Sequence, residues 1–139
     1  GERACAPAVS GATLRRMDWV AGVVLAVVVT LFLVLKQLGQ VSQAKALSFL
    51  QQGARVVDVR SVQEFHSGHL PNAINIPLGE IPSRIAQEVP NKEQALLLHC
   101  VSGARSGMGT RLLKRMGYTK VFNLGSYGRA ERIVRQSQA

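Results

Sequence analysis

The longest apolar run of the chain covers residues 19–35. It carries no charged side chain, and Thr30 supplies its only hydroxyl group. A helix over this run would be about 25 Å long, at the short end of what crosses the hydrocarbon core of a membrane. A buried helix of a globular domain usually keeps a polar stripe, so we predict a single transmembrane helix over residues 19–35, with Trp19 at the interface. The run exceeds the apolar region of most signal peptides, so we favour a retained span over a cleaved one.

The apolar pattern changes after a short linker, residues 36–40. From there, short apolar strands alternate with segments whose apolar residues recur at helical spacing. Ser42 can cap the first of these helices, and Gly53 can end it. We predict helices over 43–52, 62–67, 78–89, 104–116 and 127–136, and strands over 55–59, 73–76, 95–100 and 121–124. This alternation predicts an α/β fold with a central parallel sheet covered by helices on both faces.

The stretch from residue 95 to residue 107 carries the candidate chemistry. An apolar strand ends at His99 and Cys100, a short loop with Gly103 at its centre follows, and a helix then begins. Gly103 permits a left-handed turn, which lets successive loop N–H groups point inward toward an anion. The partial positive charge at the helix N-terminus also lowers the pKa of a nearby thiol. This arrangement predicts that Cys100 is a reactive thiolate rather than a structural cysteine.

Three segments of the chain resemble the rhodanese family. Cys100 begins the pattern Cys-x-x-x-x-Arg-Ser, which in rhodaneses follows the central strand. Residues 56–77 resemble a second family motif, and residues 116–125 resemble a third. The segments occur in the family's order and spacing between residues 41 and 134. The resemblance implies a rhodanese-like three-layer fold and sulfurtransferase activity.

The resemblance also implies a reaction and the residues that perform it. Cys100 would accept a sulfane sulfur from a donor such as thiosulfate, and the persulfide would pass that sulfur to a thiophilic acceptor such as cyanide or a thiol. The loop that would bind substrate consists of Val101, Ser102, Gly103, Ala104, Arg105 and Ser106. This reaction needs no cofactor and no metal ion.

Residues around the loop are expected to support it. Arg105 would either bind the anionic donor or brace the loop by pairing with a carboxylate such as Glu64, and the resemblance favours the brace. Ser106 would hydrogen-bond the thiolate, cap the helix, or do both. Asp58 and Arg60 would be scaffold residues that mark the exposed end of their strand.

Three further positions are interpreted as structural. His69 lies in a family motif, and His99 is expected on the opposite face of the strand from Cys100, so we disfavour a Cys–His catalytic pair. Many rhodaneses carry Gly-Gly-x-x-x-Trp near their end, whereas this chain has Tyr127 in the aligned run. We expect Tyr127 to take part of the tryptophan's place in the site wall.

Two other functions remain open at this point. A non-catalytic rhodanese-like module could bind a partner at the membrane surface, although such modules often lose the cysteine. A phosphatase or arsenate reductase of this fold would carry five residues between Cys and Arg, whereas this chain has four. The shorter loop favours sulfur transfer.

Positive charge gathers in the last third of the chain. The net charge is +9, and residues 100–139 hold eight Lys and Arg side chains against one Glu. We expect Arg111, Lys114 and Arg115 on the helix face opposite Met108, Leu112 and Met116. The last helix carries Arg129, Arg132 and Arg135, one arginine every three residues. A tethered domain favours anionic lipid head groups as the partner of these basic helices, and we do not expect nucleic acid binding.

We interpret residues 1–18 as a disordered N-terminal segment and residues 41–136 as the rhodanese domain, with Met17 as a candidate start of the native chain. Cys5 has no motif around it. The span predicts a single-pass protein of the inner (plasma) membrane. We favour the cytoplasmic over the periplasmic side for the domain. A start at Met17 places positive charge after the span, the basic C-terminal helices would meet the anionic cytoplasmic leaflet, and a low-pKa thiolate survives better in a reducing compartment. If Arg15 and Arg16 belong to the native chain, positive charge instead precedes the span and the domain is exported.

Overall fold

The computed structural model describes residues 11–139, with side-chain surroundings from residue 18 onward. Within the described residues the chain divides into two units, one ending at residue 37 and one formed by residues 38–139. The expectations for residues 1–10, including that for Cys5, lie outside the described residues.

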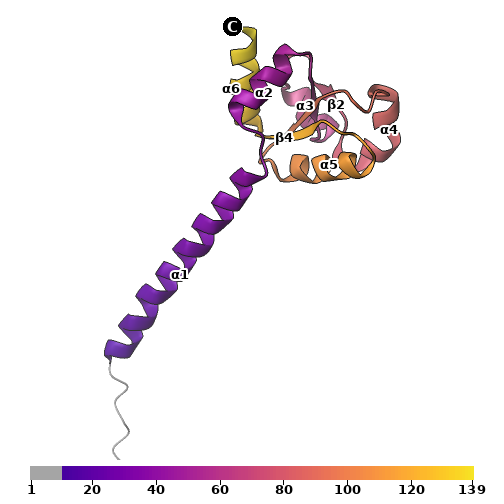
Figure 1. Cartoon of the computed structure of the whole chain (residues 1–139). Helices are drawn as coiled ribbons and strands as arrows, with labels where there is room; N and C mark the ends of the chain where they lie inside the picture. Colours follow the sequence, from indigo (N-terminus) through magenta and orange to yellow (C-terminus); the bar gives the residue numbers. More distant parts are fainter. Residues whose placement is uncertain (1–10) are drawn as a thin grey trace, which may run out of the picture. The chain divides into compact units, whose positions relative to one another are not determined.

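Helix α1 (Gly11–Leu38) contains the apolar run (Figure 1). Its side chains are exposed from residue 18 onward, Trp19 at 63% among them, and the helix is long and apolar enough to cross a membrane. The predicted helix is therefore present, but it is longer at both ends. Disorder is the wrong expectation for residues 11–18, because Leu and Arg residues there favour helix. The predicted linker is shorter, because the helix continues through Leu38.

Four parallel strands form the sheet of the second unit, in the order β2-β1-β3-β4. They are β1 (Arg55–Asp58), β2 (Ile74–Asn75), β3 (Leu96–Cys100) and β4 (Val121–Ser126). β3 lies between β1 and β4, and every residue of it is buried. The predicted parallel sheet is confirmed. β4 runs past its predicted end to Ser126, through a register shift opposite Leu98 and His99.

Helices cover both faces of this sheet (Figure 1). They are α2 (Gln43–Gln51), α3 (Val62–Ser67), the 3-10 turn η1 (Leu78–Glu80), α4 (Ile81–Glu88), α5 (Ala104–Arg115) and α6 (Tyr127–Gln138). One buried cluster packs the sheet against η1, α4 and α5, and a second packs it against α2 and α6. The Ser42 hydroxyl caps α2 by accepting from the Lys45 N–H, as predicted. His69 stacks on Phe65 at 4.0 Å between ring centroids, a structural contact.

Alternation along β3 places its side chains on both faces. Leu96, Leu98 and Cys100 join the cluster with α4 and α5, whereas Leu97 joins the cluster with α2 and α6. His99 therefore lies on the face opposite Cys100, as expected. The nucleophile candidate consequently lies on the α5 face, at the carboxyl end of the central strand.

Asp58 and Arg60 do not mark an exposed strand end, and that expectation is wrong. They are 0% and 7% exposed, respectively. The Arg60 guanidinium donates to both Asp58 carboxylate oxygens, at 2.7 to 3.0 Å, and to the Gly68 carbonyl at 2.7 Å. Opposite charges that satisfy one another can be buried together, whereas either one alone could not.

The predicted apolar face of α5 is also wrong in part. Met108 is 52% exposed, and Met108, Arg111, Leu112 and Arg115 line one shallow pocket of about 230 Å³. These positions follow i, i+3, i+4 and i+7 spacing, so they share one helix face rather than opposing faces. The helix instead buries Ser106, Gly109, Thr110 and Leu113, and a Cβ on Gly109 would come within 2.9 Å of Leu98.

Candidate active site

Cys100 lies where β3 meets the loop that begins α5. The thiol-bearing residue is 1% exposed. Gly103 caps the N-terminus of α5 with a φ of 91°, the left-handed conformation that the sequence predicted from its glycine. This turn bends the loop back over the sulfur. The Gly103 N–H donates to the Cys100 Sγ at 3.0 Å, and the Ser106 hydroxyl lies 3.6 Å from the same sulfur.

The pKa of the Cys100 thiol reflects two opposing effects. Burial raises this pKa, because it disfavours the charged thiolate. The hydrogen bonds from Ser106, Gly103 and Ser102 lower it, and together they outweigh burial. The thiol pKa therefore lies below its ordinary value, so the loop stabilises the anionic, nucleophilic form of the sulfur.

The residues predicted to form the loop differ in their exposure. Cys100, Gly103 and Ser106 are buried, Arg105 is intermediate, and Val101, Ser102 and Ala104 are exposed. The buried members surround the sulfur. The exposed members form the outer surface of the loop.

Arg105 braces the loop through α3, as expected. Its two terminal guanidinium nitrogens each donate to one carboxylate oxygen of Glu64, both at 2.8 Å. Glu64 also accepts from the Ser61 N–H at 2.8 Å, while the Ser61 hydroxyl accepts from the Glu64 N–H, which completes a capping box. The Arg105 bond is the main reason that the pKa of Glu64 is lowered to about 2. One carboxylate thus fixes both the start of α3 and the Cys100 loop.

A family model described as a rhodanese-like domain matches residues 42–128, which is more than half of the chain. The chain belongs to the rhodanese family.

Several known rhodaneses are similar to this chain. It is 42% identical over 69 residues to the thiosulfate sulfurtransferase PspE of Escherichia coli strain K12, a match that covers 50% of this chain and 66% of PspE. It is 33% identical over 101 residues to the human thiosulfate:glutathione sulfurtransferase, covering 63% of this chain and 88% of that protein. An E. coli rhodanese solved with anions superposes with a TM-score of 0.54 at 38% identity, over 55% of this chain and 91% of that structure. The match therefore spans just under two thirds of the length of PspE.

Asn123 supports the loop of this rhodanese domain from β4. Its amide donates to the Gly103 carbonyl at 3.2 Å, and its carbonyl accepts from the Gly125 N–H at 3.0 Å. The Ser106 hydroxyl lies 2.8 Å from the Asn123 Oδ1 and 3.1 Å from the Gly103 carbonyl. A hydroxyl has one proton, so these two oxygens and the Cys100 sulfur compete for it. The sequence placed Asn123 in a family motif but gave no reason to assign it this role.

Gln40 packs directly behind the same loop. A Cβ on Gly125 would come within 3.0 Å of the Gln40 side chain, and a Cβ on Gly103 within 3.4 Å of it. The next residue, Val41, donates its N–H to the main-chain carbonyl of Asn123 at 2.9 Å. The sequence missed this contact, because Gln40 had been placed in the linker and nothing in a linker residue indicates its tertiary partner.

His99 lies in a different environment, on the other face of β3. It is 0% exposed, and neither ring nitrogen has a hydrogen-bond partner among the described residues. Its Nε2 is 3.7 Å from the Asp58 carboxylate, too long for a hydrogen bond. Burial is the main cause that lowers the pKa of His99, so the neutral ring is favoured. The Tyr127 ring packs against His99 and the Arg60 guanidinium, in the α2 and α6 core that Cys100 does not join.

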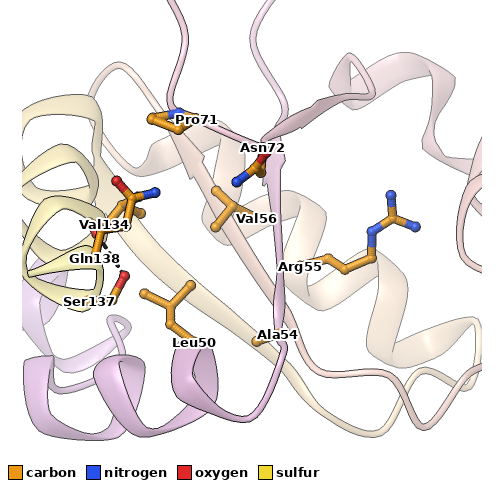
Figure 2. Close-up of a pocket in the computed structure, with 9 residues that line it drawn as sticks. All are labelled: Leu50, Ala54, Arg55, Val56, Pro71, Asn72, Val134, Ser137 and Gln138. Atoms are coloured by element: carbon orange, nitrogen blue, oxygen red, sulfur yellow. Dashed lines mark hydrogen bonds between the residues drawn. The ribbon is translucent and has the colours of Figure 1, made fainter.

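A pocket of about 430 Å³ lies beside the first residues of β1 (Figure 2). It is lined by Leu50, Ala54, Arg55, Val56, Pro71, Asn72, Val134, Ser137 and Gln138. Arg55 begins β1, and in the parallel register it pairs with Leu96, at the far end of β3 from Cys100. Figure 2 shows the Arg55 side chain pointing away from the residues of α6. The pocket contains none of the predicted site residues. Within the described part of the chain, no group of three metal-ligating side chains comes together.

Proposed function

We propose that this rhodanese domain transfers a sulfane sulfur through a persulfide on Cys100. The observation that carries the proposal is the buried sulfur itself, which accepts the Gly103 N–H at 3.0 Å and has a lowered pKa. A thiolate held by inward-pointing amides is both nucleophilic and able to carry an anionic outer sulfur. Relatives named as thiosulfate sulfurtransferases support the reaction class.

The first half-reaction loads the enzyme. The Cys100 thiolate attacks the outer sulfur of thiosulfate, a new S–S bond forms, and the S–S bond of thiosulfate breaks. Sulfite leaves with the electron pair of the broken bond, and Cys100 is left as a persulfide anion. The loop N–H groups would stabilise that outer sulfur, because they already point toward the thiol.

The second half-reaction returns the thiolate. An acceptor such as cyanide or a thiolate attacks the outer sulfur of the persulfide. The bond between the two sulfurs breaks, its electron pair returns to Cys100, and thiocyanate or an acceptor persulfide departs. One relative is named for glutathione as well as thiosulfate, which supports a small thiol as an acceptor. The charges and the sulfur balance with no cofactor or metal ion.

The loop residues have separate roles in this proposal. Val101, Ser102 and Ala104 form the exposed surface that a donor meets. Arg105 holds the loop in place rather than binding the donor, because both of its terminal nitrogens are bonded to Glu64. The Ser106 hydroxyl can change its hydrogen-bond partner from the Asn123 or Gly103 oxygen to the sulfur as negative charge develops there.

We also propose that α1 anchors the domain in the inner (plasma) membrane, with the domain on the cytoplasmic side. The support is that α1 is long enough and apolar enough to cross a membrane. Fusions at Ala139 test the side. A cytoplasmic reporter should be fluorescent, and an alkaline phosphatase fusion should be inactive. The reverse pattern would place the domain outside.

Thiocyanate formation from thiosulfate and cyanide tests the function. The full chain should show saturable turnover with ping-pong kinetics, because each substrate meets a different form of Cys100. Turnover no faster than that of a Cys100→Ser control would contradict the proposal and favour the non-catalytic module instead.

A further inference from the structure

A second pocket, of about 280 Å³, lies where the chain leaves α1. Its lining consists of Gly39, Gln40, Val41, Ser42, Lys45, Thr110, Lys114, Val121, Phe122 and Asn123. The lining includes two lysines and no acidic side chain. Among the described residues neither lysine makes an ion pair. This pocket therefore carries an unbalanced positive charge.

The two ammonium groups converge on one aromatic ring. Lys45 Nζ lies 4.7 Å from the Phe122 ring centroid, and Lys114 Nζ lies 6.0 Å from the same centroid. Phe122 itself stacks on Phe49 at 4.6 Å, which fixes the ring. Cation–π contacts of this kind hold a cation in place without neutralising it. Two cations from different helices, α2 and α5, are thus held beside one cavity.

Chain connectivity places this pocket at a particular depth if α1 spans a membrane. The predicted span ends at residue 35, and the helix continues to Leu38. These last helical residues advance the chain by about 4.5 Å, and the head-group layer on each side of a bilayer is about 5–7 Å thick. Gly39, the first residue of the pocket, then lies at head-group level.

We propose that this juxtamembrane pocket binds the phosphate of an anionic lipid head group through Lys45 and Lys114. The inference rests on the proposed membrane anchoring. It narrows the expected lipid contact of the basic helices to Lys114 of α5, adds Lys45 of α2, and leaves out the α6 face of Arg129, Arg132 and Arg135. That face is less available than its sequence indicated, because Arg129 donates to the Leu124 and Val41 carbonyls.

The full chain in lipid nanodiscs provides the test, with the reactivity of each lysine measured by mass spectrometry. In phosphatidylcholine mixed with phosphatidylglycerol, labelling of Lys45 and Lys114 should slow about fivefold relative to phosphatidylcholine alone, the effect expected for one lysine at an anionic surface. Lys120, which does not line the pocket, should change much less. Equal reactivity of the pocket lysines in both membranes would overturn the inference.

A matched pair of variants makes the test specific. Lys45→Gln with Lys114→Gln should reduce the phosphatidylglycerol retained on purification by about 30-fold, if the two contributions add. Lys120→Gln with Arg132→Gln removes the same charge from equally exposed positions outside the pocket and should retain the lipid within about twofold. Thiocyanate formation by both variants should match that of the unmodified chain, which shows that they fold. Equal loss of phosphatidylglycerol from the two double variants would overturn the proposal that the pocket binds the lipid.

Two further arms separate the alternatives. Inorganic phosphate added to phosphatidylcholine nanodiscs should not protect Lys45 or Lys114. Slower labelling of the two lysines in the presence of phosphate would show that the pocket binds a soluble anion, and it would overturn the proposal that the ligand is a lipid. Failure of the chain to enter either nanodisc would remove the proposed anchor, and this inference with it, while leaving the sulfur-transfer proposal intact.

Discussion

Adjacent residues of β3 provide the most instructive comparison in this domain. Cys100 and His99 are both buried on the central strand, on opposite faces, and the pKa of each is lowered. A lowered pKa favours the charged form of a cysteine, the thiolate, but the neutral form of a histidine. The cause differs accordingly, because hydrogen-bond donors surround the sulfur, whereas the ring nitrogens of His99 have no hydrogen-bond partner in the described structure. Environment rather than residue type thus separates a nucleophile from a core residue.

The largest expected effect separates these two residues directly. Cys100→Ser should reduce thiocyanate formation to background, because a serine hydroxyl cannot carry the sulfane sulfur. His99→Leu should keep turnover within about threefold, since a neutral buried ring contributes packing rather than charge. Steady-state rates measure the turnover of both variants, and circular dichroism shows whether they are folded. Loss of activity in a folded His99→Leu protein would show that the two faces are functionally coupled.

A smaller effect is expected when one donor to the sulfur is removed. Ser106→Ala removes the hydroxyl but keeps the backbone N–H, so it should raise the thiol pKa and lower the thiolate fraction at neutral pH. The dependence of iodoacetamide alkylation rate on pH gives the midpoint. Ser102→Ala removes a hydroxyl from the exposed part of the same loop and should leave the midpoint unchanged. An unchanged midpoint in Ser106→Ala would mean that its hydroxyl stays with Asn123.

A substitution at Glu64 tests the pair with Arg105 that holds the Cys100 loop, rather than the hydrogen bonds to the Cys100 sulfur. Its folded pKa of about 2 lies below the ordinary 4.5, so the stability that it contributes is present above pH 4.5 and is lost as pH falls toward 2. Glu64→Gln should therefore flatten the decrease in Tm over that range. The variant should also have a lower Tm at pH 7, because the Arg105 pair is weakened. A parallel decrease in both proteins would indicate that other carboxylates dominate acid unfolding.

The smallest expected effect is the pH dependence caused by His99. Its folded pKa lies below 6.5, so the unfolded chain binds a proton more readily, and stability is lost as pH falls below 6.5. Asp58, Arg60 and Tyr127 face this ring, and Asp58 opposes part of the shift. His99→Leu should reduce the slope of Tm between pH 6.5 and 5. A slope that does not change would mean that His99 is protonated in the folded protein, paired with Asp58.

The features that were predicted correctly from the sequence are those that depend mainly on local sequence patterns and on the family motifs. Glycine at position 103 indicated the left-handed turn, apolar alternation indicated β3 and the separation of His99 from Cys100, and Arg105 was expected to pair with Glu64. The sequence could not predict contacts between distant segments. Gln40 was interpreted as linker although it packs behind Gly103 and Gly125, because that contact depends on where β4 places Gly125.

Buried charge was the other source of error. Asp58 and Arg60 were expected to be exposed because charged residues usually are. Their mutual hydrogen bonds allow burial, and only the fold shows that the two side chains turn inward together. The same reasoning applies to α5, where Gly109 rather than Met108 contacts the sheet, because close packing on Leu98 selects the residue without a side chain.

The mass of the full chain after treatment with thiosulfate tests the central claim most directly. Peptide mapping should locate one added sulfur atom on Cys100, and cyanide should remove it with stoichiometric release of thiocyanate. Cys5 provides an internal control in the same sample and should remain unmodified. A chain that gains no sulfur, or that gains it equally on Cys5, would contradict a Cys100 loop built to hold a persulfide.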